Sequence, residues 1–162
     1  MYASAMEFLE EERDAWLPYE ALIDLSDEQL DRPTPPDGPA HGWTARDLLG
    51  HVLAWQGFAL AVATELAVGE ETPTRDRVVA DWDARGDAVN DEWLAEWRAL
   101  PLEEVRRRAR QQPGELRGYL TVVPETRWIK NPDVFGFFFE NTTEHYEEHA
   151  PELEAVLASA QT

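Results

Sequence analysis

The sequence predicts an all-α fold, an antiparallel four-helix bundle with one or two additional short helices. Three observations lead to this prediction. Apolar residues recur at helical spacing through most of the 162 residues. Strand patterns are nearly absent, apart from the short apolar runs LTVV and FGFFF, and the connections are of short or medium length. A chain of this length is expected to form one domain, residues 1–162, with its own core.

The first two predicted helices are separated by a connector rich in proline. Residues 3–24 are expected to form the first helix, with a kink at Pro18, because proline removes a backbone hydrogen bond from a helix interior. The connector DRPTPPDGPAHG contains four prolines and two glycines and cannot continue the helix. Thr44 is the predicted N-cap of the next helix, with Asp47 completing a capping box. That helix is expected to cover residues 45–68.

The rest of the chain is predicted to be helical as well. Residues 75–100 carry a helical pattern with a break near Gly86. The following helix, LEEVRRRARQQ, is expected to kink or end at Pro113. Asn131 is the predicted N-cap of the last helix. Pro151 is expected to break that helix near its second histidine.

Composition excludes several classes of protein. The chain contains no cysteine, so a bound metal would need imidazole or carboxylate ligands, which suit zinc, nickel, iron or manganese. The net charge of −19 disfavours nucleic acid and anionic membranes as partners. No apolar stretch approaches the roughly 20 residues that span a membrane, and the N-terminus lacks a signal-peptide pattern. A cytoplasmic location is therefore expected.

Three of the four histidines occupy positions where they could act together. His145 and His149 are four residues apart and share one face of a helix, and His51 lies on the apolar face of another helix. A single histidine on such a face is more often a core residue than a ligand. Three buried imidazoles are costly unless something binds them, and a divalent metal would do so. Three ligands would leave a coordination position open, as in catalytic zinc sites.

Several residues near these histidines are candidates for a pocket or for supporting the ligands. Trp55 and Phe138 are close to the proposed ligands along the chain, and Asn141 lies one turn before His145. Glu144 and Asp47 are further candidates for bonds to the ligands. For the aromatic residues the alternative is core packing, and for the polar ones an ordinary helix position. No side chain is assigned as catalytic.

Two segments of the sequence resemble the motifs of the DinB-like (damage-inducible B) superfamily. The segment GWTARDLLGH, residues 42–51, is followed by Trp55 and resembles W-[ST]-x-x-D-L-L-x-H. The segment TTEHYEEH, residues 142–149, resembles the H-x-x-x-H motif of the last helix. The resemblance covers essentially the whole chain. DWDARGDAVNDEW and PLEEV are most similar to the branch that includes colibactin self-protection proteins.

The resemblance implies a four-helix bundle, often dimeric, with a divalent metal held by His51, His145 and His149. Zinc or nickel is expected, with iron and manganese as alternatives. Related members are thiol transferases that use bacillithiol, mycothiol or another low-molecular-weight thiol, including mycothiol-dependent maleylpyruvate isomerase. The chain lacks the additional C-terminal domain of those isomerases, which disfavours that activity. Pro151 is expected to tilt His149 and loosen the site.

Three functions remain open from the sequence. The first is a metal-dependent S-transferase that joins a thiol to a small-molecule electrophile and forms a homodimer. The second is a metal-assisted hydrolase or self-resistance protein that opens a reactive small molecule with water. The third is a non-catalytic, stress-related metal-binding protein.

Overall fold

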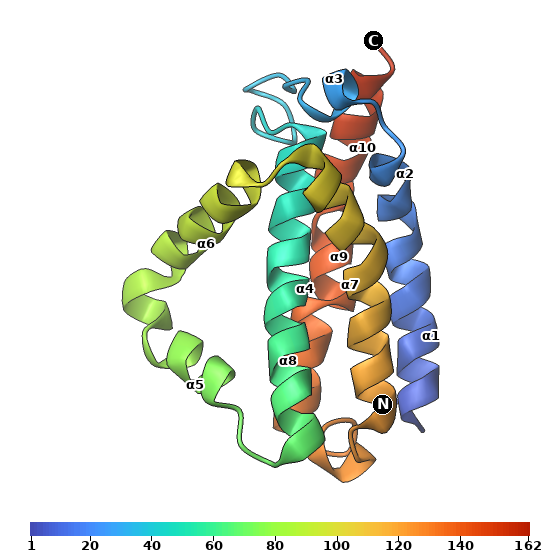
Figure 1. Cartoon of the computed structure of the whole chain (residues 1–162), viewed down its shortest axis with the longest axis vertical. Coiled ribbons are helices and arrows are strands. Elements are labelled where there is room, and N and C mark those ends of the chain that lie inside the picture. The colour runs from blue at the N-terminus through green and yellow to red at the C-terminus, as the bar shows by residue number, and fades with distance from the viewer.

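The computed structural model describes residues 1–162 and is all-helical, which confirms the all-α part of the prediction. The helices are α1 (Ala5–Trp16), α2 (Glu20–Ile23), α3 (Asp27–Leu30), α4 (Ala45–Val68), α5 (Pro73–Ala80), α6 (Trp82–Ala99), α7 (Leu102–Val122), α8 (Pro132–Asn141), α9 (Thr143–Glu148) and α10 (Ala150–Ala160), with 3-10 turns at Leu17–Tyr19 and Glu125–Arg127. Helices α1, α4, α7 and α8–α10 lie along the long axis, and α5 and α6 form an arm that stands away from them (Figure 1).

Helix α4 is central and packs against α6, α7, α8 and α10, while α1 packs against α7 and α9. In Figure 1, α1 and the α8–α10 segment run upward, whereas α4 and α7 run downward. The prediction of a uniformly antiparallel arrangement is therefore wrong for α4 and α7. The α5–α6 arm carries the chain back to the end where α4 began, so the next helix repeats the direction of α4.

Helix α4 begins and ends where the sequence predicted. The Thr44 hydroxyl accepts a 3.0 Å hydrogen bond from the Asp47 N–H, and the Asp47 carboxylate accepts one of 3.1 Å from the Thr44 N–H. By length and composition alone α4 could cross a membrane, so the prediction that no apolar stretch approaches that length is wrong. A helix with neighbours on several sides needs apolar residues around most of its circumference, which explains this composition.

The positions where helices are interrupted agree only in part with those predicted from prolines and glycines. Pro18 does interrupt the first helix, in a 3-10 turn. The break in the third segment falls at Asp81 rather than at Gly86, since Gly86 lies inside α6. Helix α7 continues through Pro113, so the proline does not end it, and FGFFF and most of LTVV are helical. Ala109 and Leu116 are buried on either side of Pro113, so packing holds α7 against its neighbours through the proline.

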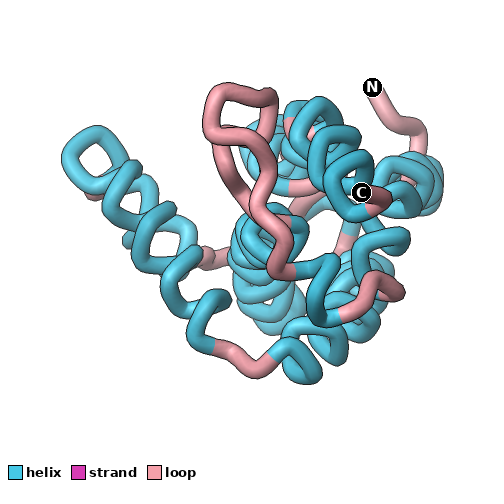
Figure 2. Tube along the Cα trace, turned by 90° about the horizontal axis from the view of Figure 1, so that it is seen from above, coloured by secondary structure: helices cyan, strands magenta, loops and turns pink.

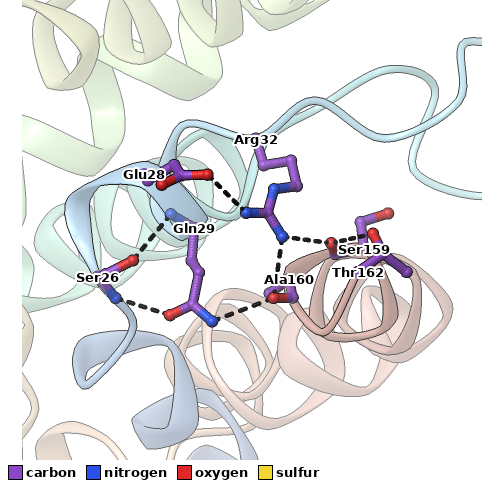
Figure 3. Close-up of polar contacts among 7 residues, drawn as sticks. All are labelled: Ser26, Glu28, Gln29, Arg32, Ser159, Ala160 and Thr162. Carbon is purple, nitrogen blue, oxygen red and sulfur yellow. Dashed lines mark hydrogen bonds and ion pairs between the residues drawn. The ribbon is translucent and has the colours of Figure 1, made fainter.

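The last helical segment is joined to α3 at the end of the chain. Figure 3 shows the Gln29 amide and the Arg32 guanidinium each donating a 3.1 Å hydrogen bond to the carbonyl of Ala160. Arg32 also donates to the carbonyl of Ser159 at 3.2 Å. The final carbonyls of a helix have no partners within it, so these side chains satisfy them and fix α10 in place.

The α5–α6 arm has little core of its own. Seen from above, α6 extends sideways from the other helices (Figure 2). No residue of α5 is buried, and in α6 only Leu94 and Trp97 are. Trp97 packs so tightly on α4 that a Cβ atom at Gly50 would lie 2.9 Å from the Trp97 Cβ. The buried contacts of the arm thus lie against the first half of α4, while Thr74 and Arg75 at its other end are bonded to Glu65 and Asp133.

Candidate metal centre

His51 is positioned by the capped first half of α4. Its ring is half-buried and contacts Trp43, with 5.1 Å between the ring centroids. Trp43 precedes the N-cap Thr44, so the capping box that starts the helix also places this indole over the imidazole. Trp43 lies outside the helical pattern of the sequence and was not among the predicted site residues.

His145 and His149 come from a segment that is interrupted twice. Thr142, with φ −126° and ψ −100°, separates α8 from α9, and His149 itself forms the junction between α9 and α10. Pro151 lies in the first turn of α10, where the missing N–H has no intrahelical partner to lose. The predicted break near His149 is therefore present. His149 nevertheless lies beside the other two histidines, and the predicted loosening of the site by Pro151 stays a prediction.

The three histidines form an equilateral triangle. Each pair of Nε2 atoms in His51, His145 and His149 is 3.1 Å apart. Three nitrogens that share one ion at about 2.0–2.1 Å are expected to be roughly 2.9–3.4 Å apart, for angles between octahedral and tetrahedral values. The donor set and its spacing therefore fit a divalent cation, and these three residues could bind a metal.

Two of these imidazoles are held in the neutral form that a metal requires. Burial, followed by the neighbouring His149, lowers the pKa of His51 from 6.5 to about 4. Burial, followed by His149 and His51, lowers the pKa of His145 to about 3. Metal ligation needs an unprotonated nitrogen, so neither residue would have to lose a proton at neutral pH.

Glu152 is the carboxylate best placed to support one of the three candidate metal ligands, His149. Its Oε1 lies 3.5 Å from Nδ1 of His149, and its buried Oε2 has no hydrogen-bond partner. A histidine bound to metal through Nε2 carries its proton on Nδ1, and such protons are usually donated to a carboxylate or carbonyl. Glu152 could accept this one after a small rotation. Glu152 was not among the predicted supporting residues, although its position three residues after His149 was available as a signal.

The other proposed supporting residues have different roles. Asp47 completes the α4 cap and pairs with Arg98 at 2.7 Å; burial would raise its pKa, but these bonds outweigh burial and lower it. The Asn141 amide donates to the Phe137 carbonyl at 2.8 Å, which leaves its oxygen free. Glu144 is neither bonded to a histidine nor in contact with the cavity described next.

A cavity of about 400 Å³ opens beside the triangle, between α4, the α8–α9 segment and the arm. Its apolar wall combines residues of α4, α5, α6 and α8. The lining residues are His51, Trp55, Phe58, Val78, Val79, Trp82, Asn90, Phe137, Glu140, Asn141, His145, Glu148 and His149.

Two of the three predicted pocket residues, Trp55 and Asn141, line this cavity. Phe138 does not. It is fully buried and packs on Trp128, with 5.8 Å between ring centroids, and the adjacent Phe137 lines the cavity instead. One residue along a helix turns a side chain by about 100°, a difference that the apolar run FGFFF could not resolve.

A buried polar layer supports the α9 side of the site. The Tyr146 hydroxyl donates to Glu12 at 3.0 Å and accepts a 2.8 Å hydrogen bond from Gln56. Gln112 donates to the Gln56 side-chain oxygen at 3.0 Å, and Arg117 pairs with Glu12. The layer thereby joins side chains from α1, α4, α7 and α9 between the two apolar clusters of the core.

Fold and site define the class of this protein: an all-helical DinB-like domain with three adjacent histidines that could bind a metal. The chain belongs to the family described as the mycothiol maleylpyruvate isomerase N-terminal domain, which matches residues 9–136. This range includes His51 and ends before α9, so the grouping of His145 and His149 with it is a result of the structure. Comparisons with curated proteins and with solved structures gave no match.

Proposed function

We propose that the protein is a divalent-metal-dependent S-transferase that joins a low-molecular-weight thiol to a small electrophile. The observation that supports this most is the 3.1 Å triangle of Nε2 atoms beside a cavity of about 400 Å³. Structural zinc sites usually have four protein ligands, whereas three leave a position for a reactant. The family, whose description names a mycothiol enzyme, supports a thiol as that reactant.

A zinc or nickel ion, or alternatively iron or manganese, would lower the pKa of a thiol or water at the open position. The chain's own residues would bind and orient the reactants. Trp55 and Phe58 give the cavity part of its apolar wall. The Asn90 oxygen accepts from the Trp55 indole at 2.8 Å, which leaves the Asn90 NH₂ group to donate. The free oxygen of Asn141 can accept, so the two asparagines offer a donor and an acceptor for a polar ligand group.

Membership of this superfamily also supports a proposal about the arrangement of the helices and the oligomeric state. We propose that α1, α4, α7 and the α8–α10 segment are the four members of a DinB-type bundle, and that the protein acts as a cytoplasmic homodimer. Light scattering of the purified protein tests the dimer: a mass near twice 18.5 kDa is expected, and a monomer would contradict it.

The metal and the reaction are tested together with His51→Ala and a matched control, His41→Ala. His41 is exposed and lies outside the triangle. Untagged wild type and His41→Ala are expected to bind one ion per chain and to conjugate mycothiol or bacillithiol to an epoxide. His51→Ala should lose both properties. Stoichiometric metal and full conjugating activity in His51→Ala would refute the proposal.

The same assay separates the other two functions. Turnover of the epoxide at an unchanged rate without any thiol would identify a hydrolase. Bound metal with no rate acceleration under any of these conditions would indicate a non-catalytic metal-binding protein.

A further inference from the structure

Glu152 in the first turn of α10 and its neighbour His149 each hold a buried polar atom that has no hydrogen-bond partner. We infer that Glu152 is a positioning residue: it keeps the proton of His149 on Nδ1 and so leaves the Nε2 lone pair free before any ion binds. This inference rests on the proposed function, because it states how one ligand of the same site is prepared.

Burial leaves the Glu152 carboxylate with one available partner. Only 19% of its side chain is exposed, and its Oε2 is buried without a hydrogen bond. No arginine or lysine forms an ion pair with it, and its one contact of that kind is the 3.5 Å approach of Oε1 to Nδ1 of His149. A buried carboxylate without a donor is costly, so a donor at this position would stabilise the folded chain.

His149 has the complementary need. Its side chain is 18% exposed, and its Nδ1 is buried without a partner. A neutral imidazole carries its proton on one of its two nitrogens, and hydrogen bonding decides which one. With the proton on Nδ1, a small rotation of either side chain would give a hydrogen bond of about 2.9 Å to Glu152. With the proton on Nε2, Nδ1 and the carboxylate would be two acceptors facing each other, so the contact favours the Nδ1–H form.

The triangle of Nε2 atoms gives this choice its consequence. Three bare nitrogens 3.1 Å apart would set their lone pairs against one another, so in the metal-free chain at least one of them donates a proton to a neighbour. Glu152 makes His149 an acceptor in the triangle, and the donor is then His51 or His145. His149 is thus the ligand whose Nε2 lone pair is available without a change of tautomer.

The helix terminus offers a simpler role for Glu152, which the structure does not favour. An acidic side chain in the first turn is stabilised by the helix dipole, and one three residues after the N-cap can bond back to the N-cap N–H. That bond is absent, since the His149 N–H is bonded to the His145 carbonyl at 3.3 Å. An exposed carboxylate would serve the dipole equally well, so the burial of Glu152 against Nδ1 calls for the histidine as its partner.

Nitrogen-15 NMR of the metal-free wild-type protein tests the inference without any variant of Glu152, because protonated and bare ring nitrogens have well-separated chemical shifts. The spectrum is recorded after chelator treatment at about pH 8, above the usual histidine pKa of about 6.5. The His149 signals are assigned by their absence from His149→Ala. The Nδ1–H form is expected at His149. An imidazole in water prefers the Nε2–H form, so finding that form at His149 would overturn the inference.

Two leucine substitutions on α10 then assign the effect to Glu152. Glu152→Leu removes the acceptor and should shift His149 toward the Nε2–H form. Its zinc affinity, measured by competition with a chelator, should fall about 10–100-fold. Glu154→Leu is the matched control, because Glu154 is exposed on the same helix, and it should keep the wild-type tautomer and affinity. A Glu152→Leu protein that keeps the Nδ1–H form, or that binds zinc as tightly as the control does, would overturn the inference.

The two proposals fail in distinguishable ways. A wild-type protein that binds zinc but holds His149 in the Nε2–H form contradicts only the role of Glu152. A wild-type protein that holds the Nδ1–H form but binds no metal contradicts only the metal-dependent function.

Discussion

The hydroxyl of Tyr146 donates a hydrogen bond to the Glu12 carboxylate at 3.0 Å, which connects α9 directly to α1. Tyr146 is the residue after His145, so this bond fixes the segment that carries two of the three histidines. Burial, followed by the charge of Glu12, raises the pKa of Tyr146 far above its usual value, and the hydroxyl remains a donor at any physiological pH. A polar bond in the core thus positions part of the proposed metal site.

Tyr146→Phe should destabilise the fold. The substitution keeps the ring but leaves the Glu12 oxygen and the Gln56 amide without a partner in the core, at a cost of about 1–3 kcal/mol. Urea denaturation measures this loss. Tyr119→Phe is the control, because Tyr119 is exposed and its hydroxyl makes no hydrogen bond within the chain. Equal stability of the two variants would show that the layer contributes nothing.

Gly50→Ala should loosen the junction between the arm and α4. The new Cβ would lie 2.9 Å from the Trp97 Cβ, and relieving this contact is expected to cost about 1–3 kcal/mol. Gly118→Ala, inside α7 with no atom within 4 Å of its new Cβ, should instead stabilise the protein by up to about 1 kcal/mol. Thermal unfolding of both variants checks the two opposite signs, and a stabilised Gly50→Ala protein would contradict the tight packing.

Acidification should destabilise the metal-free protein through His51 and His145. Their pKa values are about 4 and about 3 in the folded protein, against 6.5 in an unfolded chain. Between these values the unfolded state binds more protons, so the free energy of unfolding falls as the pH decreases from 6.5 toward 4. The urea midpoint should therefore be lower at pH 5 than at pH 7. The double variant His51→Gln/His145→Gln should show a smaller difference in urea midpoint between pH 5 and pH 7. An unchanged difference would mean that other groups cause the loss of stability.

Zinc should stabilise the wild-type protein and not His149→Ala. An ion that binds only the folded state contributes about 2.7 kcal/mol when its free concentration is about 100 times Kd. For a chain of this size that corresponds to a rise in Tm of about 5–10 °C, reversed by a chelator. Scanning calorimetry of both proteins with and without zinc measures the shift. The same rise in His149→Ala would exclude His149 as a ligand.

The sequence predicted the fold best where local signals were complete. The bounds of α4 follow from the capping box at Thr44 and from Gly69, both of which act within one turn of the helix. Pro113 does not end α7, because its local cost is outweighed by burial of the residues around it, which belong to contacts between helices. The parallel direction of α4 and α7 depends on the length and path of the α5–α6 arm, which helical periodicity does not report.

In the site too, local signals were predictive and contacts between distant segments were not. The spacing of His145 and His149 is local, and their proximity to His51 was predicted from motifs on two helices. Trp43 is brought to His51 by the connector before α4, so helical periodicity could not indicate it. Phe138 was predicted to line the pocket where Phe137 does, because a run of apolar residues does not define which side of a helix faces the core.

The two sides of the cavity differ in how freely they can change. The histidines lie on helices that also carry the core, where a substitution alters stability as well as chemistry. The opposite wall, with Val78, Val79 and Trp82, belongs to an arm that buries few residues. Substitutions there can alter what enters the cavity at little cost to folding. Selection or protein engineering could thus adapt the cavity to a new ligand by substitutions in residues 73–90 while the same three histidines are retained.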